Sequence, residues 1–154
     1  MASLERTGGS AATSLAARDP DELYELLAIR ARTIVADPDQ AGNPALSAEY
    51  DAALMGPLDD LRAWGQRFFT RFNADAYALV CGAGDAAERK KILDAFGVSR
   101  EAVAGAMVTL IVGNLGLAPA IATVVVALVL RLFFEDSYKA MCDVWGQKVE
   151  KPAA

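Results

Sequence analysis

Two carboxylates that follow the first predicted helix have the spacing closest to that of a metal site. Asp37, Asp39 and Gly42 occupy the first, third and sixth positions of a helix–loop–helix calcium loop. The pattern then fails, because Ala41 and Ala48 stand at the fifth and twelfth positions, where oxygen ligands are required. Two prolines also interrupt the segment. We therefore interpret it as an Asp/Pro/Gly turn and expect no metal ligand in it.

Nucleophilic and general-base chemistry lacks its usual residues. The chain has no histidine, which removes the commonest general base and metal ligand and any Ser-His or Cys-His pair. Cys81 and Cys142 stand far apart, each in an apolar helical context. This spacing argues against a zinc site and predicts two buried free thiols in a reducing compartment rather than a disulfide. We expect no catalytic, cofactor-binding or metal-binding residue and no cofactor, and hence a protein that is not an enzyme.

The charge distribution argues against nucleic acid as a partner. The formal net charge is −5, and residues 1–60 carry eleven acidic side chains against four arginines. Residues 61–154 carry eleven basic and nine acidic side chains, without a basic stripe. Phosphate neutralisation supplies most of the affinity for nucleic acid, so an acidic chain of this kind is a poor candidate. Anionic membrane surfaces are disfavoured for the same reason.

Helical periodicity, caps and breakers predict an all-α fold, a compact bundle of about six helices. Asp19 and Pro20 suit the cap and first position of one helix, and Asp85 opens a second capping box. Residues 1–18 are small and polar, and we expect a flexible tail there, followed by a single α-helical domain over 19–150. The expected helices span approximately 20–36, 47–55, 57–81, 86–96, 100–114 and 119–148.

The segment 102–134 is the most distinctive part of the chain, because Arg131 is its only charged residue. A Gly-Asn-Leu-Gly break predicts that it folds as a buried apolar helical hairpin. Gly105, Thr109 and Gly113 recur every four residues, which predicts a strip of small residues where the second arm, with Thr123 and Ala127, approaches closely. The first arm is apolar over roughly 18 Å of helix, well short of the roughly 30 Å that a membrane span needs. The core of a soluble bundle is therefore favoured.

The end of the last predicted helix is amphipathic, with its apolar residues on one face. Phe134, Tyr138, Met141 and Trp145 recur at helical spacing, with charged residues around the rest of the helix. Together with the small-residue strip, this stripe forms the candidate interaction surface. The aromatic residues Trp64, Phe68 and Phe72 have similar spacing and are interpreted as core. Three flanking arginines could neutralise the acidic first helix; they are Arg62, Arg67 and Arg71.

These features predict a non-enzymatic helical interaction or oligomerisation module, whose partner is a second copy or another protein. Its alanine-rich, arginine-over-lysine composition favours a bacterial source, and its thiols favour the cytoplasm. The alternative is a membrane-active protein, pore-forming or membrane-associated, that inserts the apolar hairpin 102–134. A small-molecule binder with carboxylates around an apolar pocket is a third possibility.

Overall fold

In a computed structural model that describes residues 2–82 and 86–150, eight α-helices follow one another and no strand occurs within these ranges. The predicted all-α class is thereby confirmed. The elements are α1 (Ala2–Leu15), α2 (Pro20–Ala36), the 3-10 helix η1 (Pro38–Gly42), α3 (Ala52–Met55), α4 (Leu58–Cys81), α5 (Ala86–Phe96), α6 (Arg100–Leu115), α7 (Pro119–Phe133) and α8 (Tyr138–Glu150). The predicted number of six helices was wrong, because the additional helix α1 precedes the predicted ones and the last predicted helix is divided into α7 and α8.

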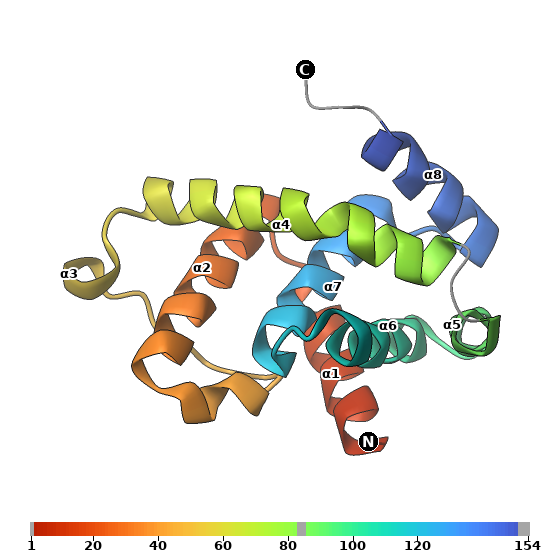
Figure 1. Cartoon of the computed structure of the whole chain (residues 1–154), viewed down its shortest axis with the longest axis horizontal. Helices are drawn as coiled ribbons and strands as arrows, with labels where there is room; N and C mark the ends of the chain where they lie inside the picture. Colours follow the sequence, from red (N-terminus) through yellow and green to blue (C-terminus); the bar gives the residue numbers. More distant parts are fainter. Residues whose placement is uncertain (1, 83–85, 151–154) are drawn as a thin grey trace.

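Helix α1 replaces the flexible tail that was expected over 1–18. It packs mainly against α6 and also against α7 (Figure 1). Gly8 and Gly9 are buried within it, and Ala12, Leu15 and Ala16 join the main hydrophobic core. Small residues allow α1 to approach α6 closely, so the composition that suggested a tail is what permits the packing.

Helix α7 lies at the centre of the fold. All its residues from Ala120 to Leu130 are buried, and α1, α2, α6 and α8 pack against it (Figure 1). A helix that is apolar on all sides requires such cover. Helix α6 packs against α7 but makes more extensive contacts with α1, so the small-residue strip does not face the second arm as expected. Among the described residues, no helix combines the length and apolarity of a candidate membrane span.

The single helix expected over 119–148 is interrupted between α7 and α8. Phe134 leaves the helical conformation with ψ of 133°. Ser137 then begins α8, because its Oγ accepts a hydrogen bond from the Ala140 amide at 3.1 Å. The interruption turns α8 back toward the end of α4, as Figure 1 shows.

The expected helix over 47–55 is reduced to the four residues of α3. The preceding loop is held by Arg30 of α2, whose guanidinium donates to the carbonyl oxygens of Pro44 and Leu46 at 3.0 and 2.9 Å. These bonds fix the loop in an irregular conformation, and a helix begins only where Asp51 accepts from the Ala53 amide at 3.0 Å.

Helices α2, α4 and α6 follow the predicted ranges closely. Asp19 stands at the N-cap of α2, although its side chain makes no cap hydrogen bond. Ser99 caps α6 by accepting from the Ala102 amide at 3.0 Å. The capping box predicted from Asp85 begins outside the described residues.

Candidate interaction surfaces

Two residues of the predicted interaction stripe lie inside the molecule. Met141 and Trp145 on α8 are fully buried. The Trp145 ring stacks on Phe133 of α7 with centroids 5.7 Å apart, and its indole Nε1 donates to Oδ1 of Asn73 on α4 at 2.7 Å. These side chains therefore join α4, α7 and α8 and are not available to a partner in this conformation.

The other two residues of the stripe are half-buried and also have partners in the chain. The Tyr138 hydroxyl donates to the Val80 carbonyl oxygen at 2.6 Å, and burial raises the pKa of this phenol. The Phe134 ring lies parallel to that of Phe96 with centroids 5.9 Å apart. The guanidinium of Arg100 lies 5.0 Å from the Phe134 centroid, within reach of a cation–π interaction.

Cys81 and Cys142 form a disulfide, with Cα atoms 5.7 Å apart. The prediction of two free thiols was therefore wrong. The cysteines meet because the interruption before α8 lets that helix pack against the end of α4. The Tyr138 and Trp145 hydrogen bonds support the same packing.

The small-residue strip is divided between a helix contact and the surface. A Cβ atom at Gly105 would overlap the carbonyl oxygen of Glu5 and lie 3.1 Å from the carbonyl carbon. Gly105 therefore lies against α1. Thr109 donates to the Gly105 carbonyl oxygen at 3.0 Å, and Gly113 has nothing within 4 Å of a Cβ position. Thr109 and Gly113 line a pocket of about 320 Å³ together with Glu5 and residues of α5 and α6.

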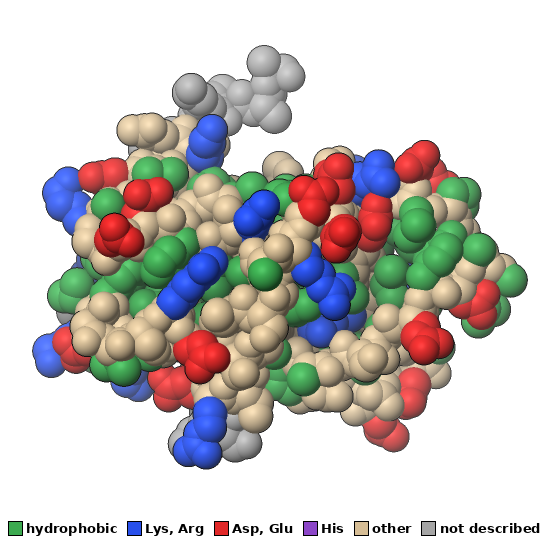
Figure 2. Space-filling view, turned by 180° about the vertical axis from the view of Figure 1, so that it is seen from behind, with side chains coloured by type: hydrophobic (Ala, Val, Ile, Leu, Met, Phe, Trp, Pro, Cys, Tyr) green, Lys and Arg blue, Asp and Glu red, His purple; other side chains and the backbone are tan. Residues whose placement is uncertain are grey.

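An apolar surface that the sequence analysis missed lies at the α3 end of the molecule. Leu54 is 82% exposed, and Tyr50 and Leu58 are also exposed. We call these three residues the α3 patch. Figure 2 shows hydrophobic side chains gathered at this end, with acidic groups around them. The exposed acidic residues of this part of the chain are Glu49, Asp51, Asp59 and Asp60.

A second exposed apolar surface lies around α5. Leu93 is 53% exposed and Val98 is 76% exposed, and we call them the α5 patch. Lys90, Lys91 and Arg100 are exposed in the same part of the chain. Figure 1 shows α3 and α5 at opposite ends of the molecule. Tyr50 and Val98 lie in loops and Leu54 lies in the four-residue α3, where the sequence shows no helical periodicity, whereas Leu58 begins α4 and Leu93 lies in α5.

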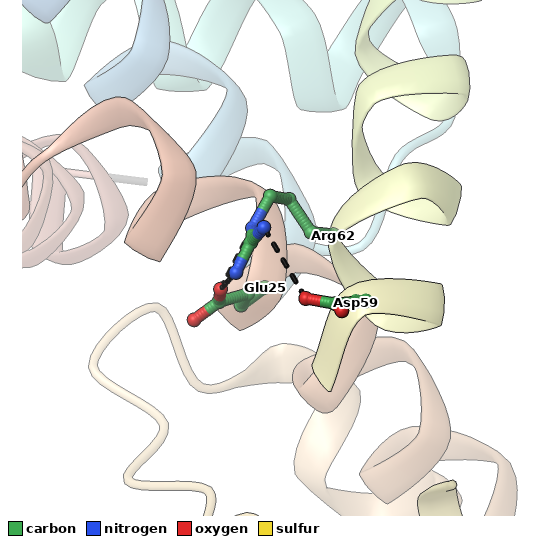
Figure 3. Close-up of polar contacts among 3 residues, drawn as sticks. All are labelled: Glu25, Asp59 and Arg62. Carbon is green, nitrogen blue, oxygen red and sulfur yellow. Dashed lines mark hydrogen bonds and ion pairs between the residues drawn. The ribbon is translucent and has the colours of Figure 1, made fainter. Parts of the chain in front are cut away.

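Arg62 fixes the start of α4 beside the α3 patch. Its Nε and Nη2 donate to Oε2 of Glu25 on α2 at 2.9 and 2.7 Å, and its Nη1 lies 3.4 Å from Oδ1 of Asp59 (Figure 3). The hydrogen bond to Glu25 raises the pKa of the guanidinium. Arg62, Arg67 and Arg71 were the arginines expected to neutralise the acidic helix over 20–36, which is α2. Of these three, Arg62 pairs with a carboxylate of α2 within the same chain.

The aspartate-containing turn has a structural role. Asp37 Oδ1 accepts from the Asp39 amide and its Oδ2 from the Gln40 side chain, both at 3.3 Å, which caps η1. In the described ranges, no cluster of three or more potential ligands from His, Cys, Asp or Glu could hold a metal ion.

Replacing Asn73 with alanine tests the buried α4–α8 contact. The Trp145 indole N–H would lose its acceptor inside the core, so we expect the free energy of unfolding to fall by about 1–3 kcal/mol. Urea denaturation followed by circular dichroism measures this change. Asn73→Asp, which keeps an acceptor oxygen, should cost less than Asn73→Ala. Equal stability of Asn73→Ala and the parent would show that this hydrogen bond contributes nothing.

No protein-family model, curated protein or solved structure matches this chain.

Proposed function

We propose that this protein is a non-enzymatic helical module that self-associates end to end. The observation that carries the proposal is the pair of apolar patches at opposite ends of the molecule. A contact between unlike patches is heterologous, so it generates closed rings or open filaments rather than a two-fold dimer. The α3 patch of one copy would bury Leu54 against Leu93 and Val98 of the next.

Charge complementarity favours this arrangement over a symmetric one. Residues 47–62 carry four carboxylates and one arginine, whereas residues 87–101 carry four cations and three carboxylates. Two α3 patches facing each other would bring like charges together, which costs free energy. An α3 patch facing an α5 patch pairs an acidic rim with a more basic one, which favours the encounter at low salt.

The rival expectation, insertion of 102–134 into a membrane, requires α6 and α7 to leave their partners in the chain. The side chains of α7 are buried by four other helices, and Gly105 is in backbone contact with α1. Insertion would expose the apolar faces of the helices that now pack against α6 and α7. End-to-end association requires no such rearrangement, because both patches are already exposed.

The disulfide also changes the cellular compartment that we propose for this protein. The expectation of a cytoplasmic protein rested on two free thiols, and the Cys81–Cys142 bond removes that support. Disulfides persist mainly in oxidising compartments, so we propose that the protein acts in one, outside the cytoplasm. Its alanine-rich, arginine-over-lysine composition supports a bacterial source.

Sedimentation velocity over a range of protein and salt concentrations tests the self-association. We expect the weight-average mass to rise with protein concentration and to fall when salt screens the rims. Leu54→Asp should abolish the rise, because it places a charge in the apolar contact. Ala74→Asp is the matched control, since it adds the same charge at an exposed position of α4 outside both patches.

Charge exchange tests the orientation of the copies. Asp60→Lys and Lys91→Glu should each weaken association, whereas the double variant should restore much of it. A monomer at every protein concentration would disprove self-association. Loss of association in Ala74→Asp, or none in Leu54→Asp, would show that the α3 patch is not the interface.

A further inference from the structure

An open pocket of about 620 Å³ lies between α1 and the loop that follows α2. Figure 2 shows Lys and Arg side chains lying in a hollow on the face opposite to that of Figure 1. None of the described residues that line the pocket is acidic. Its polar lining includes Arg6, Ser10, Ser14, Arg18, Arg30 and Ser47.

The α1 side of the pocket is a regular polar stripe. Arg6, Ser10 and Ser14 follow one another at intervals of four residues, so they share one face of the helix. Arg18 continues the spacing just after the helix ends. The stripe therefore places guanidinium groups toward both ends of a row of hydroxyl donors. The sequence predicted a flexible tail over residues 1–18 and therefore did not indicate that these side chains share one helix face.

Arg30 forms the opposite wall and is a buried cation. The residue is 3% exposed, and its Nη1 donates to the Ala120 carbonyl oxygen at 2.8 Å, in addition to its bonds to the loop. No carboxylate of the described residues forms an ion pair with it, and its Nε is buried without a hydrogen-bond partner. Neutral carbonyl groups do not cancel the charge, and a buried charge without a counter-ion is costly.

Arg18 adds a second positive charge near Arg30. Burial first, and then the charge of Arg18, lower the pKa of Arg30 to about 10. The smaller of these two effects is the repulsion between the cations of Arg18 and Arg30. A bound anion would offset both the burial and the repulsion.

We propose that this pocket binds a small organic phosphate, with the phosphate group held by the arginines and serine hydroxyls. Guanidinium groups bind phosphate oxygens through paired, charge-assisted hydrogen bonds, and hydroxyl groups can complete the shell. The volume exceeds what a free phosphate ion needs and falls in the range of small-molecule sites. Leu15 and Leu46 also line the pocket and offer an apolar wall for the carbon part of the ligand. Within the described ranges, none of the residues that line this pocket belongs to the α3 patch or the α5 patch.

Isothermal titration calorimetry of the full chain at constant salt tests the proposal, with glycerol 3-phosphate, inorganic phosphate and glycerol as probes. We expect saturable one-to-one binding of glycerol 3-phosphate, weaker binding of inorganic phosphate and none of glycerol. Arg18→Gln should weaken binding roughly tenfold, the effect of losing a charge-assisted hydrogen bond. Ser14→Ala should weaken it less. Arg71→Gln, which removes an exposed arginine of α4 outside the pocket, is the matched control.

Three results would overturn the proposal. They are no saturable binding of glycerol 3-phosphate at millimolar concentration, equal loss of affinity in Arg71→Gln and Arg18→Gln, and inorganic phosphate binding as tightly as the ester. Because a ligand that binds the folded state raises its stability, the unfolding temperature gives a second readout. Glycerol 3-phosphate should raise this temperature in the parent chain and in Leu54→Asp alike, which separates this site from self-association.

Discussion

A single methyl group added at Gly105 is expected to lower the free energy of unfolding by about 2–3 kcal/mol. In an unconstrained helix the same Gly→Ala change would raise stability by roughly 1 kcal/mol, because alanine is the better helix former. The expected sign is reversed because α1 occupies the space that the new Cβ atom needs. That atom would overlap the carbonyl oxygen of Glu5 and lie 3.1 Å from its Cγ.

The contact is tight from both sides, which is why we expect little relief by relaxation. A Cβ atom at Gly9 of α1 would lie 2.9 Å from the Gly105 nitrogen and 3.1 Å from its Cα. Backbone atoms cannot rotate away as a flexible side chain can. Helices α1 and α6 would have to separate, and α1 would lose part of the burial of Ala12 and Leu15.

The matched control is Gly113→Ala on the same helix. A Cβ atom at Gly113 meets nothing within 4 Å, and the residue is exposed. Chemical denaturation should show Gly113→Ala at or above the stability of the parent, and hydrogen exchange should show faster opening of α1 in Gly105→Ala alone. If both variants were stabilised equally, the α1–α6 contact would not be as close as described.

The dependence of α1 on its contact with α6 also explains why the sequence predicted some helices and missed α1. Helices α2 and α6 begin at local signals, namely Asp19-Pro20 and Ser99, which act within a few residues of the chain. Helix α1 has no comparable signal, and two glycines lower its intrinsic helix propensity. Its stability depends on α6, about a hundred residues later, and no local pattern reports such a contact.

The interruption at Phe134 was missed for a related reason. Apolar periodicity continues from α7 into α8, so the pattern predicts one helix. The observed turn depends on Ser137 capping α8 and on Trp145 finding Asn73 on α4, a residue 72 positions away. Once the helix is divided, Cys142 can reach Cys81; in a continuous helix we expect it to be carried away from the core.

Periodicity identified an apolar face on α8 but not what covers it. Met141 and Trp145 were expected to meet a partner, and they are buried within the same chain. Conversely, Leu54 and Val98 are among the most exposed apolar residues, although neither belongs to a regular stripe. Sequence pattern therefore identified the apolar face of α8 but not whether that face is exposed, because exposure depends on how the helices assemble.

Reduction of the disulfide is expected to destabilise the fold by about 4 kcal/mol, the chain-entropy estimate for a loop of this length. The cysteines are 61 residues apart, and the bond closes a loop that contains α5, α6 and α7. In the oxidised chain this loop restricts the unfolded ensemble. For a domain of this size the unfolding temperature should fall by roughly 10–15 °C.

Thermal unfolding with and without reductant measures this effect, and the double variant Cys81→Ala/Cys142→Ala provides the control. The variant should unfold at about the temperature of the reduced parent and should not respond to reductant.

Alkylation of the native protein should modify neither cysteine before reduction and both after it. Two reactive thiols in protein purified from an oxidising environment would contradict the bond. An unchanged unfolding temperature after complete reduction would instead show that the bond adds no net stability to the packing that Tyr138 and Trp145 support. In that case the disulfide would follow from the packing of α8 and would not be needed to maintain it.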